Sequence, residues 1–157
     1  MVRFRHLAAA TTGLTFALIL LGVYTAAMGA GLSCSAQWPF CDGGLIPQSF
    51  PSFVEWFHRL IAMITGFFIL GTAAGAWKYT GEKRIRGAAT LALAVTPLQM
   101  VLGGATVFVY TPLVQVAHHA AALIIFGALL ATTLWSYEAE GTPDARSTES
   151  AAGYPSD

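Results

Sequence analysis

The sequence predicts an all-α, polytopic membrane protein, built as a bundle of four transmembrane helices with an extracytoplasmic loop. Charged residues make up 10% of its 157 residues and hydrophobic residues 55%, whereas an average soluble domain carries roughly 25% charged residues. Residues 8–28 include no Asp, Glu, Lys or Arg, and neither do the 51 residues from Gly87 to Tyr137. A soluble fold of this length could not bury so much uncharged chain. The composition therefore argues against a cytosolic enzyme, a nucleic-acid-binding protein and a disordered chain.

A membrane-spanning helix needs about 20 mostly apolar residues. Tyr110-Thr111-Pro112 divides the long uncharged stretch into two helices, because proline and the residue before it disfavour helix continuation. The first apolar run is longer than a typical signal-peptide core, so we expect a retained helix rather than a cleaved signal. The four predicted spans, which together form one domain over residues 1–137, are residues 8–28, 53–77, 85–108 and 113–137.

The positions of Lys and Arg predict how the chain is oriented. The N-terminus carries Arg3 and Arg5, and the connection between the second and third spans carries four more basic residues, whereas residues 29–52 and 109–112 carry none. Because Lys and Arg favour the cytoplasmic side, we expect a multi-pass protein of the cell membrane with both termini in the cytoplasm and the 29–52 loop outside. Residues 138–157 are polar and rich in small residues, which predicts a disordered cytoplasmic tail.

The chain has two cysteines, Cys34 and Cys41, and both lie in the predicted outer loop. A disulfide can persist on the oxidising side of the membrane, and closing so short a loop would stabilise the fold by about 2.5 kcal/mol. The pair is either a structural staple or a thiol relay that exchanges electrons with a partner. Membrane disulfide oxidoreductases generally use Cys-x-x-Cys pairs, and this spacing differs, which favours the staple.

Ionisable side chains inside a membrane span are functional candidates by default. Glu55, His58 and Arg59 lie at the start of the second span, and His118 and His119 lie early in the fourth. Both spans enter from the outer surface, so these histidines lie at nearly equal depth, about 8 Å below the helix ends. His58 and one of the adjacent histidines could therefore ligate one metal, and a haem fits edge-on within a four-helix bundle. The alternative is that the histidines form polar contacts between helices.

Several short motifs are shared with one known family. They are Gly31-Leu32-Ser33-Cys34, Trp38-Pro39-Phe40-Cys41, Gly44-Leu45-Ile46-Pro47, Glu55-Trp56-Phe57-His58-Arg59, Gln99 with Leu102-Gly103-Gly104-Ala105-Thr106-Val107, and Val116-Ala117-His118-His119. Through these motifs, and over residues 8–137 as a whole, the chain resembles the haem A synthases. These membrane enzymes convert haem O to haem A for haem-copper oxidases.

The resemblance implies an oxidoreductase that oxidises the C8 methyl group of haem O to the formyl group of haem A. The bound cofactor would be haem (haem b, haem O or haem A) whose iron has two axial histidines, and electrons would pass to an unidentified acceptor. His58 and His119 become the axial ligands, with His118 as the alternative to His119, because Val116 and Ala117 align with the family pattern Val-Ala-Leu-His. That pattern has a single histidine where this chain has two.

The resemblance also assigns roles to four other residues. Glu55 becomes the catalytic acid-base group, and the Cys34–Cys41 pair becomes the loop disulfide. Arg59 either pairs with Glu55 along the helix or contacts a haem propionate, because a guanidinium group matches carboxylate geometry.

The length of the chain departs from the family pattern. Typical members have eight spans in two similar halves, and this chain resembles the N-terminal half, as in the half-length form of some prokaryotes. We therefore expect a homo-oligomer of at least two copies. The resemblance further implies haem O as the substrate and haem O synthase as a further partner. Two other functions use the same residues: a b-type bis-histidine haem electron carrier without substrate turnover, and a membrane thiol-quinone oxidoreductase.

Overall fold

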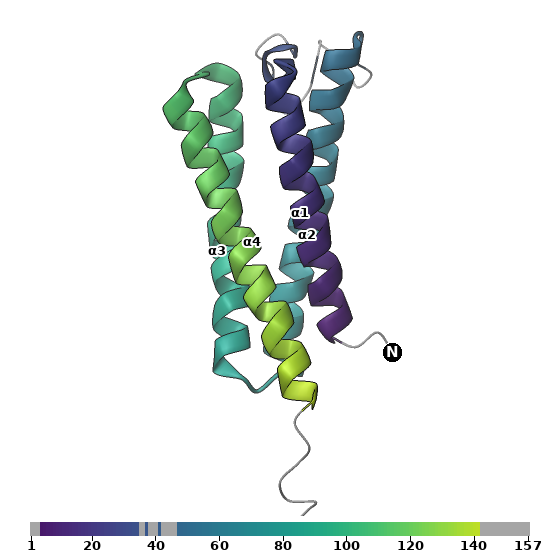
Figure 1. Ribbon diagram of the computed structural model, residues 1–157, viewed down its shortest axis with the longest axis vertical. Helices are drawn as coiled ribbons and strands as arrows, with labels where there is room; N and C mark the ends of the chain where they lie inside the picture. Colours follow the sequence, from purple (N-terminus) through teal and green to yellow (C-terminus); the bar gives the residue numbers. More distant parts are fainter. Residues whose placement is uncertain (1–3, 35–36, 38–40, 42–46, 142–157) are drawn as a thin grey trace, which may run out of the picture.

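The computed structural model describes residues 4–34, 37, 41 and 47–141, and these residues form helices and no β-strand. Each of the four α-helices is long and apolar enough to cross a membrane, which confirms the predicted four-helix membrane fold. The motif residues Trp38-Pro39-Phe40 and Gly44-Leu45-Ile46 and the tail 142–157 lie outside the described residues. The elements, shown in Figure 1, are α1 (Phe4–Ala27), the short 3₁₀ helix η1 (Ala30–Leu32), α2 (Phe50–Tyr79), α3 (Lys83–Phe108) and α4 (Pro112–Gly141).

The helices extend beyond the apolar spans that the sequence predicts. α2 begins at Phe50 because the Ser49 hydroxyl accepts a hydrogen bond from the backbone N–H of Ser52, and a proline is tolerated in the first turn. α4 continues past residue 137, where Glu138 pairs with Arg84 at the start of α3 (Nη1 to Oε2, 3.1 Å). Hydropathy locates the part of a helix that lies in lipid, whereas caps and ion pairs determine where its polar ends stop.

Successive helices run antiparallel, so the start of α1 and the end of α4 lie at one end of the bundle (Figure 1). We call this end the terminal end, and the opposite end, with the α1–α2 and α3–α4 connections, the loop end. α4 packs against α3 and α1, and α2 packs against α1 and α3. No Cα atoms of α2 and α4 lie within 8 Å of each other among the described residues, so these two helices are diagonal across the bundle.

The buried aliphatic clusters lie toward the terminal end. One joins the second half of α2 to the first half of α3 and the middle of α4, and the other joins the second half of α2 to the start of α3. These clusters hold the terminal half of the bundle together. The loop half carries the polar and ionisable side chains described below. The two clusters are Ile69, Ala92, Ile125, Ala128 and Leu129, and Ala73, Ala76, Ile85 and Ala89.

Two hydroxyl pairs fasten α1 to its neighbours within the same terminal half. Thr11 lies 2.8 Å from Thr72 of α2, and Thr12 lies 2.9 Å from Thr133 of α4, measured between Oγ1 atoms. Each α1 hydroxyl also donates to a backbone carbonyl four residues earlier. Because a hydroxyl has one proton, Thr72 and Thr133 donate in the two interhelical bonds. The hydrophobic effect does not drive helix association in lipid, so interhelical hydrogen bonds of this kind help to hold the helices together.

Candidate functional site

Three imidazole rings gather in the loop half of the bundle. His58 lies near the start of α2, and His118 and His119 lie near the start of α4. The rings of His118 and His119 have centroids 6.0 Å apart at an interplanar angle of 90°. The structure therefore places the histidines that the sequence predicts to share a site in the same half of the bundle, on two helices whose Cα atoms lie more than 8 Å apart.

Each helical hairpin places a glycine against one of these rings. A Cβ atom on Gly22 of α1 would lie 3.1 Å from Cε1 of His58, and one on Gly103 of α3 would lie 3.2 Å from Cε1 of His118. Both distances are shorter than the 3.5–4.0 Å or so at which carbon atoms normally rest. The backbones of α1 and α3 thus approach the rings as closely as they do because neither residue has a side chain.

Several polar atoms in this half are buried without a hydrogen-bond partner. Among the described residues they include Nδ1 of His58, Nδ1 of His118 and the side-chain oxygen of Gln99 on α3. More than nine in ten buried polar groups in proteins have a partner, and an exception calls for an explanation such as an ion or bound group. The imidazoles are therefore suited to hold a polar or metal-containing ligand.

The two histidines of α4 have different hydrogen bonds. Nδ1 of His119 lies 2.8 Å from the carbonyl oxygen of Gln115 and must donate to it, because a carbonyl only accepts. This bond leaves Nε2 of neutral His119 with its lone pair, which is the usual state of a metal-binding imidazole. Nε2 of His118 instead lies 3.3 Å from the amide nitrogen of Gln99. Of the two rings, His119 has the hydrogen bonding expected of an iron ligand.

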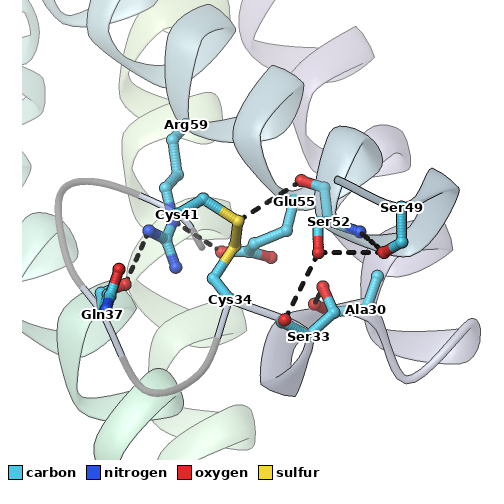
Figure 2. Close-up of a disulfide and its surroundings, with 9 residues drawn as sticks. All are labelled: Ala30, Ser33, Cys34, Gln37, Cys41, Ser49, Ser52, Glu55 and Arg59. Atoms are coloured by element: carbon cyan, nitrogen blue, oxygen red, sulfur yellow. Dashed lines mark hydrogen bonds and ion pairs between the residues drawn. A yellow bond between two sulfur atoms is a disulfide. The ribbon is translucent and has the colours of Figure 1, made fainter. Parts of the chain in front are cut away.

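Glu55 and Arg59 form a buried ion pair one helical turn apart on α2. Nε of Arg59 donates to Oε1 of Glu55 at 2.9 Å, and the two side chains are 13% and 9% exposed, respectively. Nη1 of Arg59 also donates to the backbone carbonyl of Gln37, at 2.9 Å (Figure 2). The helical pairing with Glu55, one of the two alternatives given for Arg59, is thus formed, and Arg59 additionally reaches the loop between α1 and α2.

The two cysteines form the predicted disulfide. Cys34 and Cys41 are bonded and buried, and their Cα atoms lie 4.5 Å apart. The ends of the loop contact the first turn of α2 through Ser52, whose hydroxyl donates to the carbonyl of Ser33 at 3.3 Å and whose own carbonyl lies 3.7 Å from Sγ of Cys41 (Figure 2). The disulfide therefore holds the loop against the helix that carries Glu55, His58 and Arg59.

Comparison with known proteins identifies the family. Residues 49–154 match the cytochrome oxidase assembly protein family, COX15-CtaA. The chain belongs to this family. It is 32% identical to haem A synthase of Bacillus licheniformis over 133 residues, which are 83% of the chain and 44% of that protein. It is 37% identical to protohaem IX farnesyltransferase of Halobacterium salinarum over 137 residues, 85% of the chain and 29% of that protein.

The chain therefore spans less than half the length of these curated relatives. The same holds for haem A synthase of Bacillus cereus, where 31% identity over 154 residues covers 94% of the chain and 49% of that protein. The resemblance to haem A synthases that the sequence motifs predict is confirmed. This member of the COX15-CtaA family is a multi-pass membrane protein, with four helices that satisfy the length and apolarity of membrane spans.

The roles of two residues at this site, Gly22 and Gln99, are not among those predicted from the sequence. Gly22 is not distinguished from the other glycines of the spans, and Gln99 is part of a family motif without a predicted partner. A comparison of the two hairpins could have found Gly22, since it lies five residues before the end of α1, as Gly103 does before the end of α3. Nothing in the sequence pairs Gln99 with His118.

Proposed function

We propose that the chain is a haem A synthase that oxidises the C8 methyl group of haem O to the formyl group of haem A. Its membership of the COX15-CtaA family and its similarity to haem A synthases support this activity. The observation that carries the proposal is the set of partly buried imidazoles on the diagonal helices α2 and α4, whose ring nitrogens are suited to iron.

The residues of the site fit a haem. His58 and His119 would hold its iron as axial ligands, with His118 as the alternative to His119. Gly22 leaves room for the close approach of α1 to His58. A bound haem supplies redox-active iron and, as haem O, the methyl group to be oxidised.

Glu55 is the proposed acid-base residue. Its side chain is 9% exposed and is held by Arg59, so its orientation is restricted and bulk water is largely kept away. Oxidation of the methyl group to a formyl group, with water as the source of oxygen, releases protons as electrons leave to an acceptor, and a largely buried carboxylate one turn from His58 is suited to take up a proton. The contact of Arg59 with a haem propionate stays a prediction.

The similarity to protohaem IX farnesyltransferases is compatible with this proposal. The shared segment covers 29% and 30% of the enzymes from Halobacterium salinarum and Natronomonas pharaonis, and by their names these enzymes and the haem A synthases both act on haem compounds. A haem-binding helical unit common to both would explain the similarity. Three predictions about partners are unchanged: the chain forms an oligomer of at least two copies, it interacts with haem O synthase, and it passes electrons to an acceptor.

We also propose that the loop end faces the outside of the cell membrane. Arg5, Lys78, Lys83, Arg84 and Arg86 all lie at or near the terminal end of the bundle, and cytoplasmic loops are enriched in Lys and Arg. This orientation places the disulfide on the oxidising side and the histidines toward the outer leaflet.

Conversion of a supplied haem tests the activity. The purified protein, reconstituted in lipid vesicles with a quinone or ferricyanide as electron acceptor, would receive haem O in one reaction, and protohaem IX with farnesyl diphosphate in another, and the pigments would be extracted and identified by mass. We expect haem A, or the alcohol on the way to it, from haem O and no farnesylated product from protohaem IX. Unaltered haem O together with tightly bound haem would instead favour a b-type electron carrier and contradict the proposal.

A further inference from the structure

Arg59 is held from two sides by groups that are distant from each other in sequence. Its Nε donates to the carboxylate of Glu55, and its Nη1 donates to the carbonyl of Gln37, both at 2.9 Å (Figure 2). A guanidinium group is planar and its donors point in set directions. One rigid group therefore connects the outer loop to the buried carboxylate.

The position of the Gln37 carbonyl depends on the disulfide. Cys34 and Cys41 enclose Gln37, and the backbone N–H of Gln37 donates to the carbonyl of Cys34 at 2.9 Å. Ser52 in the first turn of α2 contacts Ser33, which directly precedes Cys34, and Cys41 itself. The disulfide loop is thus attached to the helix that carries Arg59. Opening the disulfide would free the segment between Cys34 and Cys41, which includes Gln37.

We propose that Arg59 is a positioning residue through which the disulfide-closed loop orients Glu55. With the loop closed, the Gln37 carbonyl keeps the guanidinium in the one orientation that also pairs with the carboxylate. With the loop open, Arg59 loses the fixed position of the Gln37 carbonyl and its flexible stem can turn, so the carboxylate loses its fixed direction. The catalytic consequence rests on the proposed function, whereas the mechanical link between loop and carboxylate does not.

The link itself is tested without any substrate. Limited chymotrypsin digestion, followed by mass spectrometry for cleavage after Phe40 in the loop, would compare wild type with Arg59→Lys, whose ammonium cannot reproduce the two fixed donors. We expect several-fold faster cleavage in Arg59→Lys. Arg84→Lys, which alters an arginine paired with Glu138 at the far end of the bundle, is the matched control and should be cleaved like wild type.

The link also predicts reciprocity between carboxylate and loop. Glu55→Gln removes the charge on the α2 side of Arg59 and leaves the loop sequence unchanged, so we expect its loop to be cleaved faster as well. Wild-type cleavage rates in both Arg59→Lys and Glu55→Gln would overturn the proposal, whether or not the protein makes haem A.

A double-mutant cycle on haem A formation separates this role from a thiol relay. The variants are Arg59→Lys, Cys34→Ser with Cys41→Ser, and the combination of all three substitutions. If the loop acts through Arg59, each of the first two lowers the rate about tenfold and the combination also about tenfold, because both changes break one connection. Losses that multiply to about a hundredfold would mean independent roles and overturn the proposal.

The outcomes distinguish this inference from the proposed activity. If wild type forms no haem A but loop cleavage still depends on Arg59 and Glu55, the activity is wrong and the link stands. If haem A forms and loop cleavage is the same in every variant, the activity stands and the link is wrong. An unchanged low-spin haem spectrum in the serine variant would show that the protein remains folded when the disulfide is removed.

Discussion

Replacing Gly22 by alanine tests how closely α1 must approach His58. The new Cβ atom would lie 3.1 Å from Cε1 and 3.7 Å from Nδ1 and Nε2 of the ring. Carbon atoms normally rest at about 3.5–4.0 Å, so the ring or the helix must move by at least about 0.4 Å. A displacement of at least this size uses most of the tolerance of about 0.5 Å within which a functional group must be held. We therefore expect Gly22→Ala to weaken haem binding about tenfold, or about 1.4 kcal/mol.

Gly13→Ala is the matched control, because Gly13 lies on the same helix and a Cβ there would meet nothing within 4 Å. Both substitutions raise helix propensity by up to about 1 kcal/mol, so a difference between them reports the contact with His58. Haem titration followed by absorbance gives the affinity, and thermal unfolding of the haem-free proteins gives the change in stability. Equal haem affinities for the two variants would refute the argument that this glycine makes room for the ligand ring.

Three further predictions concern the ligands, the carboxylate and the hydroxyl pairs. His58→Ala and His119→Ala should each remove or weaken the low-spin haem spectrum while His118→Ala retains it, and the reverse result for the two α4 variants would assign the iron to His118. Glu55→Ala should keep bound haem and produce no haem A when haem O is supplied, and normal production would remove Glu55 from the mechanism. Thr12→Val should lower the free energy of unfolding in detergent by about 0.6 kcal/mol, since it removes one interhelical hydrogen bond, and unchanged stability would show that the bond contributes nothing.

The number of helices, their antiparallel order and the position of the histidines near the starts of α2 and α4 follow from the sequence alone. An uninterrupted apolar run long enough to cross a bilayer leaves the backbone little choice but a helix, because every N–H and C=O must be paired within lipid. The break at Pro112 is equally local. For this reason the predicted spans agree with α1 to α4 except at their polar ends, where Ser49 and Arg84 extend the helices through a cap and an ion pair.

Contacts between helices could not be inferred in the same way. In a water-soluble helix the apolar face marks the interior, but here lipid-facing and interior-facing residues are both apolar, so periodicity gives no sign of which face is buried. The close approach of Gly22 to His58, the pairing of Gln99 with His118, and the reach of Arg59 to the Gln37 carbonyl join segments far apart in the chain. Each depends on how whole helices pack, because a shift of one residue along a helix turns a side chain by about 100°.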